Sequence, residues 1–275
     1  MTQWCEFFTY DVISDLAFSE DFGMLAEGKP HRYISALHGS SRILVIAAQT
    51  PKVDQADLFG FLSGGKVDGT RPLTEAELIA DTSLLIAAGA VSTALCITFV
   101  FSHLCDNRAH LDRVRSEIDR CWDGTSPLQA NMLTPNGIQR KTPQGGCTID
   151  EKIVPAATQV SVHTMTIMRD GRHFSEPDRF MPERWIDEER PSHFNHDVRT
   201  FVPFTVGQYA CLGKNLAFQE IRLFVARVLS EFDIAYPKDY TSGPFYRDIV
   251  FKGTLKVGCL PIVITKRENK ILKLA

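Results

Sequence analysis

The chain has 275 residues, of which 44% are hydrophobic and 10% aromatic, so its composition is that of a folded protein and not of a disordered chain. Lysine and arginine number 30 against 33 aspartate and glutamate residues, which leaves a formal net charge of −3. This balance argues against a nucleic-acid partner, because phosphate contacts need a basic surplus on at least one face. Repeat and collagen-like architectures are excluded because no sequence period recurs.

The cysteines are scattered and none forms a C-x-x-C pair, so neither a disulfide framework nor a structural zinc site is predicted. A reducing compartment is the better expectation. The N-terminus has no basic segment followed by an apolar run, and therefore does not resemble a signal peptide. The seven cysteines are Cys5, Cys96, Cys105, Cys121, Cys147, Cys211 and Cys259.

The N-terminal half is predicted to be helical. Residues 1–50 read as helices with polar breaks, and residues 50–71 as a linker. Further along, apolar residues at helical spacing predict an amphipathic helix that ends near Gly124. They are Leu111, Val114 and Ile118.

A long apolar helix is predicted between these segments, over residues 75–105. Thr74 and Glu77 have the spacing of a capping box, in which the two side chains satisfy free amides at a helix start. Within it, the run Leu84–Phe101 is apolar and at the lower limit of length for a membrane span. A buried core helix is the favoured interpretation, and a membrane span is the alternative.

The C-terminal half mixes loops, strands and one helix. Residues 125–146 are predicted to be irregular, and residues 158–162 a short strand. After a loop-rich stretch with many prolines, Asn215–Glu231 predicts an amphipathic helix, and residues 250–265 alternate as strands do. The fold class is therefore mainly α with minor β, and we expect one domain over residues 1–275.

The most specific stretch surrounds Cys211, which lies between Gly207 and Gly213 and directly before the predicted C-terminal helix. Amides at a helix N-terminus stabilise negative charge, so a cysteine placed here is suited to act as a thiolate. Gly213 has no Cβ, which lets a flat group approach the backbone. The alternative is a buried cysteine at a loop–helix junction.

Phe204, Gly207, Cys211 and Gly213 form the pattern F-x-x-G-x-x-x-C-x-G, which resembles the haem-binding loop of the cytochrome P-450 monooxygenases, above all the fungal ones. The resemblance implies that these residues bind haem b and that Cys211 is the ligand of its iron. It also implies a partial cytochrome P-450 fold with a long distal helix, this loop and a C-terminal helix. Tyr209 departs from the pattern, since the family usually has a basic residue two positions before the cysteine.

Two arginines extend the resemblance. Arg184 lies in Phe174–Trp185, which is similar to the family's F-x-x-P-x-x-F-x-P-E-R-W segment, and would lock the haem loop to a helix that carries E-x-x-R. Arg140 resembles the family arginine that reaches a haem propionate through charge-assisted hydrogen bonds. The alternative for both is a solvated surface arginine.

The segment Ala88–Thr93 resembles the family's A-G-x-[D/E]-T-T pattern on the helix that crosses the distal face of haem. The resemblance implies that Ser92 and Thr93 are catalytic. Gly89 costs the helix roughly 1 kcal/mol relative to alanine, which suggests that oxygen or substrate needs the space. Val91 stands where the family has an acid, and it cannot relay a proton.

Some segments of the family pattern are missing. No E-x-x-R helix fits between Trp122 and Gln139, and Glu117–Arg120 belongs to the preceding helix by position. Arg184 is therefore expected to lack its usual partners. The first helices of the family have no counterpart, and residues 36–51 are short for the substrate-roof helices. We expect a truncated and internally deleted member.

Three functions stay open at this point. The first is a monooxygenase that inserts one oxygen atom of O2 into a small organic substrate of secondary metabolism, with electrons from NADPH through a separate reductase. The second is a catalytically impaired remnant that binds haem weakly or not at all, and the third is a small membrane protein. The resemblance places the chain on the cytoplasmic side, at the endoplasmic reticulum, without an N-terminal anchor of its own. The oligomeric state is not indicated.

Overall fold

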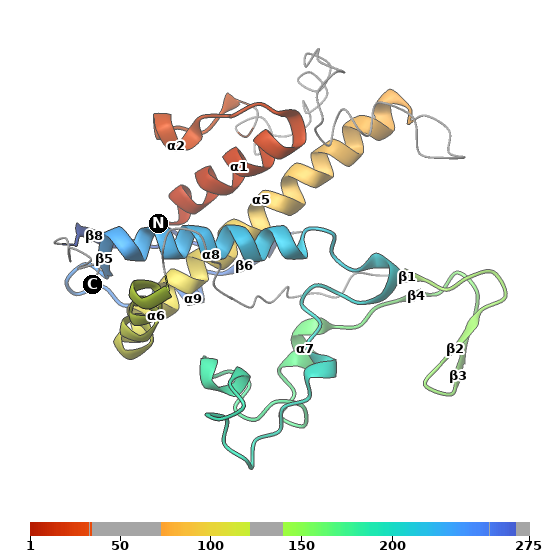
Figure 1. The fold of residues 1–275 in the computed structure, drawn as a ribbon. Coiled ribbons are helices and arrows are strands. Elements are labelled where there is room, and N and C mark those ends of the chain that lie inside the picture. Colours follow the sequence, from red (N-terminus) through yellow and green to blue (C-terminus); the bar gives the residue numbers. More distant parts are fainter. Residues whose placement is uncertain (33, 35–72, 122–139, 253, 268–275) are drawn as a thin grey trace. The chain divides into compact units, whose positions relative to one another are not determined.

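The computed structural model describes residues 1–32, 34, 73–121, 140–252 and 254–267. The chain divides into two compact units, each of which is described by itself. Unit 1 comprises Met1–Ala130 and Asn215–Ala275, and unit 2 comprises Asn131–Lys214. The prediction of a mainly α chain with small sheets is confirmed (Figure 1).

Unit 1 is built around the long helix α5, Glu75–Asp106. Its start is the predicted capping box: the Glu77 amide donates to the Thr74 hydroxyl at 3.3 Å, and the Thr74 amide donates to the Glu77 carboxylate at 2.9 Å. The helix α6, Arg108–Cys121, follows it. Among the described residues, α5 is long and apolar enough to cross a membrane. In its most apolar stretch of 18 residues, 44% is buried inside the protein.

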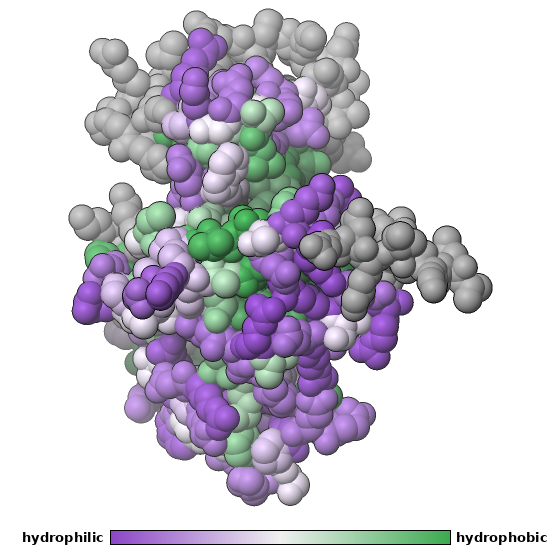
Figure 2. Space-filling view, turned by 90° about the vertical axis from the view of Figure 1, so that its left-hand side faces the viewer, coloured by the Kyte–Doolittle hydropathy of each residue, from purple (hydrophilic) through white to green (hydrophobic). Residues whose placement is uncertain are grey.

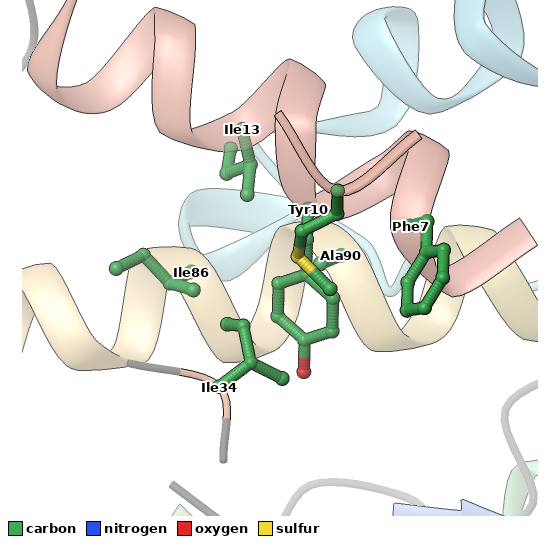
Figure 3. Packing of buried hydrophobic residues seen from close by; sticks show 7 residues of the cluster. Phe7, Tyr10, Ile13, Ile34, Ile86 and Ala90 are labelled. Atoms are coloured by element: carbon green, nitrogen blue, oxygen red, sulfur yellow. The ribbon is translucent and has the colours of Figure 1, made fainter. Parts of the chain in front are cut away.

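The core of unit 1 lies between α5 and the N-terminal helices. The helix α1, Thr2–Phe18, packs along α5, and the short helix α2, Met24–Glu27, follows a turn. Figure 3 shows apolar side chains of α1 pointing toward those of α5, where they exclude water from both helices. The cluster comprises Phe7, Tyr10, Ile13, Met24, Ile34, Ile86 and Ala90.

The contact between α1 and α5 explains the glycine in the middle of α5. A Cβ on Gly89 would lie 2.8 Å from Cδ1 and 3.1 Å from Cγ1 of Ile13, both closer than atoms in van der Waals contact. The absent side chain therefore makes room for α1. This corrects the expectation that the space at Gly89 serves oxygen or substrate, because Ile13 fills it.

The C-terminal part of unit 1 adds α8, Lys214–Glu231, as predicted, and then small sheets. The strand β5, Phe232–Ala235, pairs antiparallel with β8, Val263–Lys266. The short helix α9, Gly243–Arg247, precedes a pair of strands, β6, Val250–Lys252, and β7, Thr254–Lys256.

Two arginines tie α6 to the β5–β8 pair. Arg115 is buried and contacts the Asp233 carboxylate at 2.6 Å. Arg267, which follows β8, binds Asp119 of α6 at 2.8 Å. These ion pairs fix the end of α6 against the sheet, and the buried one depends on both partners for its stability.

Unit 2 contains little regular structure, as its prolines and aromatic residues predict. The strand β1, Arg140–Lys141, pairs with β4, Gln159–Val160, and a hairpin joins β2, Cys147–Ile149, to β3, Lys152–Val154. The helix α7, Thr164–Met168, follows. Single 3₁₀ turns then cover Pro182–Trp185, Val198–Thr200 and Gly207–Tyr209.

Several predictions from the sequence fall on residues outside the described ones. They are the helical structure of 35–50 with the short stretch 36–51, the linker at 50–71, the missing E-x-x-R helix between 122 and 139, and the irregular chain of 125–139. On the face seen in Figure 2, most of the described surface is hydrophilic, with apolar side chains exposed in patches.

The packing at Gly89 can be tested with a double-mutant cycle. Gly89→Ala gains helix propensity, but it places a methyl group against Ile13, so we expect a net loss of about 1 kcal/mol in the free energy of unfolding. Ile13→Ala removes both the Cδ1 and the Cγ1 atoms that would lie 2.8 Å and 3.1 Å from the added Cβ, so in that background Gly89→Ala should be neutral or stabilising. Urea unfolding measures both, and an equal effect in the two backgrounds would contradict the packing argument.

Candidate functional site

The loop of residues 204–213, here called the cysteine loop, is closed by its own hydrogen bonds. The Cys211 amide donates to the Phe204 carbonyl at 2.9 Å, and the Thr205 hydroxyl donates to the Tyr209 carbonyl at 2.8 Å. Gly207 has φ +79°, a conformation that a side chain would strain, and it opens the 3₁₀ turn between these contacts. The loop therefore holds the backbone of Cys211 in one place just before α8.

The Cys211 side chain is exposed, as is that of Cys259, whereas Cys5 and Cys96 are buried. The alternative of a buried cysteine at a loop–helix junction is therefore wrong. Large apolar side chains of the cysteine loop are also exposed, with Val206 at 73% and Leu212 at 99%. Apolar side chains in this state favour the binding of an apolar surface, because covering them removes them from water.

Two cations lie over aromatic rings of the cysteine loop. The guanidinium carbon of Arg140, on β1, is 4.8 Å from the ring centroid of Tyr209. The ammonium of Lys214 is 5.9 Å from the ring centroid of Phe204. Both distances are in the range of cation–π contacts, so two positive charges lie close to aromatic rings of the loop.

These residues fit haem. Cys211 offers a soft sulfur ligand for iron, and Val206 and Leu212 offer apolar cover for a flat macrocycle. An added Cβ on Gly213 would approach only the Cys211 sulfur, at 3.9 Å, so the backbone there is open to a close neighbour. Arg140 provides a donor for carboxylates.

Arg184 is buried, and carbonyl groups of its own segment satisfy it. Its guanidinium donates to Ser175 at 2.8 Å and to Glu176 at 2.9 Å, with a third, longer bond to Arg179. Arg184 therefore has hydrogen-bond partners within its own segment, and the expectation that it lacks an E-x-x-R helix stays a prediction. Nearby rings pack together behind it, namely Phe174, Trp185, His196 and Phe201. Arg184 stabilises the fold of this segment, and its role in cofactor binding stays a prediction.

On α5, three consecutive residues of the predicted distal segment point to different surroundings. Val91 packs against the apolar cluster of unit 1. Ser92 is exposed and donates to the Ala88 carbonyl at 2.6 Å, whereas Thr93 is buried and lies near the carboxyl group of Glu220 on α8. Ser92 is thus the hydroxyl that a ligand can reach, and Thr93 faces the interior.

Glu220 was not predicted from the sequence. It is 6% exposed, and burial raises its pKa to about 7, while a hydrogen bond with Thr93 lowers the pKa by a smaller amount. The Thr93 hydroxyl donates to the Gly89 carbonyl at 2.9 Å. When Glu220 is protonated, its O–H can donate to Thr93, and when it is ionised Thr93 must turn its hydrogen toward the carboxylate. An acid on the apolar face of a predicted amphipathic helix is the signal that could have identified it.

The predicted site residues belong to both units. Arg140, Arg184 and the cysteine loop lie in unit 2, and Ser92 and Thr93 lie in unit 1. That Cys211 faces Ala88–Thr93 stays a prediction, since each unit is described by itself.

The hydrogen bonds of Arg184 predict a local loss of stability. Arg184→Ala removes a buried guanidinium and leaves part-buried carbonyl groups without these donors, and we expect the free energy of local opening to fall by about 3 kcal/mol. Amide hydrogen exchange over residues 174–186 should then be roughly 100-fold faster. Arg179→Ala removes an exposed arginine that pairs with Glu176 and is the matched control. Equal exchange in the two variants would contradict the role of Arg184.

The buried acid predicts a pH dependence of stability. The Glu220 pKa is about 7 in the folded protein against 4.5 ordinarily, so the folded state holds the proton longer than the unfolded one. The contribution of Glu220 to the free energy of unfolding is fully present below pH 4.5. It falls by about 3 kcal/mol in total as the pH rises to about 7. Glu220→Gln should remove this decline.

The measurement is urea unfolding at several values of pH. Glu231→Gln is the control, because Glu231 lies on the same helix and forms an exposed ion pair with Arg227. If Glu220→Gln and Glu231→Gln changed the pH profile alike, the buried acid would not be the cause.

The chain is similar to known proteins over most of its length. Residues 128–254 match the family model described as Cytochrome P450. The Cytochrome P450 monooxygenase FCK2 of Fusarium pseudograminearum is 26% identical over 322 aligned positions, which cover 97% of this chain and 58% of the relative. The Cytochrome P450 monooxygenase aclL of Aspergillus oryzae is 28% identical, over 95% of this chain and 65% of the relative.

The chain thus spans about three fifths of the length of these relatives. The alignment with FCK2 runs over 322 positions although the chain has 275 residues, so FCK2 carries residues within the aligned region that this chain lacks. Among solved structures, that of a cytochrome P450, CYP102L1, has a TM-score of 0.77 at 20% identity and covers 97% of this chain and 68% of its own. This likeness shows the fold.

Proposed function

Because this chain belongs to the cytochrome P450 family of haem-thiolate monooxygenases, we propose that it binds haem through Cys211 and inserts one oxygen atom of O2 into a small organic substrate. The observation that supports this most directly is the exposed Cys211 in a closed loop with apolar neighbours and the Arg140 cation. Electrons would come from NADPH through a separate reductase, as is general in the family.

The chain's own residues would hold the cofactor in three ways. The Cys211 thiolate would ligate the iron, since a thiolate and not a thiol is the metal ligand. Val206 and Leu212 would cover the macrocycle and exclude water from the thiolate. Arg140 would bind a carboxylate of the cofactor through charge-assisted hydrogen bonds. Once bound, haem supplies the chemistry of dioxygen activation and oxygen transfer.

The resemblance to the family assigns the handling of protons to residues of α5. The exposed Ser92 hydroxyl, which now donates to Ala88, can turn its hydrogen toward a ligand. Val91 cannot hold a proton, and an acid in its place would put a carboxylate against the apolar cluster of α1 and α5. Val91→Asp is therefore expected to destabilise unit 1, and it is not a simple repair of a proton relay.

The second candidate is an impaired member that binds haem but turns over poorly. It is favoured by the missing acid at Val91 and by the positions that FCK2 carries within the aligned region and this chain lacks. In that case electrons delivered by the reductase would leave as peroxide in place of oxidised substrate. Product and peroxide counted per NADPH consumed distinguish the two candidates.

The proposed iron ligand can be tested by spectroscopy. The ferrous–CO complex of the chain incubated with haem should show the red-shifted Soret band of a thiolate ligand. Cys211→Ser should abolish that band because a hydroxyl is a poor ligand for this iron. Cys259→Ser, which alters an exposed cysteine outside the cysteine loop, should leave the band unchanged. A thiolate band that persists in Cys211→Ser would show that another residue is the ligand.

A further inference from the structure

We propose that Tyr209 is a positioning residue which holds the guanidinium of Arg140 at the cysteine loop, so that this arginine supplies from β1 the carboxylate-binding cation that the loop itself lacks. The inference rests on the proposed binding of haem and concerns a position at which this chain departs from the family pattern. It follows from the contact of 4.8 Å between the Arg140 guanidinium carbon and the Tyr209 ring centroid.

Both partners of this contact are anchored by the backbone. Tyr209 ends the 3₁₀ turn of the cysteine loop, and its carbonyl accepts the Thr205 hydroxyl at 2.8 Å. Arg140 is paired in register with Val160 in the β1–β4 pair. The contact therefore joins two separately held pieces of unit 2, a sheet and the loop that carries Cys211.

The contact with the Tyr209 ring does not itself use the N–H donors of Arg140. A cation–π contact uses the face of the guanidinium, whereas its five N–H donors lie in the plane and are arranged to bind a carboxylate in bidentate fashion. The tyrosine ring is 61% exposed, so the contact is a surface one. Such a contact favours the stacked arrangement by about two- to fivefold.

A basic residue at position 209 would place a positive charge on the loop itself. With tyrosine there, the charge reaches the loop from the sheet, and the ring limits the freedom of a long side chain. Removal of the ring should therefore weaken binding only through Arg140. It should affect only a ligand that has a carboxylate.

The test compares haem with haem dimethyl ester, whose carboxylates are blocked. The quantity measured is the rate of haem loss to an excess of apomyoglobin. Arg140→Ala should release haem about tenfold faster, corresponding to about 1.4 kcal/mol, and Tyr209→Ala about threefold faster. Tyr209→Phe keeps the ring face and should stay within about twofold of the unmodified chain.

The double variant should release haem no faster than Arg140→Ala alone, since the tyrosine acts through the arginine. Arg199→Ala is the control, because Arg199 is an exposed arginine of unit 2 that pairs with Asp197. With the dimethyl ester, every variant should match the unmodified chain. A Tyr209→Ala effect that persists with the ester, adds to that of Arg140→Ala or is absent with haem would overturn the proposal.

A measurement without haem separates this proposal from the proposed function. In the haem-free chain, the Arg140 side-chain protons should show an upfield ring-current shift in NMR that is kept in Tyr209→Phe and lost in Tyr209→Ala. Absence of that shift in the unmodified chain overturns the positioning role, whether or not haem binds. A chain that shows the shift but never binds haem instead contradicts the proposed function.

Discussion

The packing of α1 on α5 determines how the other features of unit 1 are arranged. Ile13 enters the space that Gly89 leaves, and the apolar cluster around it includes Val91 at its edge. With this side of α5 occupied by α1, Thr93 lies toward Glu220 on α8 and Ser92 toward solvent. The rotation of one helix about its axis thus decides which of its side chains are structural and which can meet a ligand.

The departures from the family pattern have local physical reasons. Val91 stands in apolar surroundings, where an ionised acid would be costly to bury. The Tyr209 ring contacts the cation of Arg140, which comes from β1. A cation over the ring therefore takes the place of the basic residue that the family has at this position. Arg184 is buried and binds carbonyl groups of its own segment. In each case the neighbours of the residue differ from those that the motif implies.

Glu220 adds a proton-holding group that the motifs do not mention. Its raised pKa of about 7 places protonation and ionisation within reach of neutral pH, and Thr93 can serve as donor or acceptor to it. Because the Thr93 hydroxyl also reaches the Gly89 carbonyl, the state of this acid is coupled to a backbone group of α5. The interior of unit 1 is therefore sensitive to pH at a place next to Ser92.

Signals between neighbours along the chain are enough to predict the helices of this protein and the position of the candidate site. The capping box at Thr74, the apolar periodicity of α8 and the spacing of glycines around Cys211 depend on neighbours along the chain, and such signals can be read directly. Only the tertiary structure decided that Ile13 fills the space at Gly89, that Arg184 is satisfied by carbonyl groups, and that Arg140 stacks on Tyr209. Each of these contacts joins residues distant in sequence or depends on how a loop folds back. The periodicity and spacing of residues along the chain do not predict contacts of this kind.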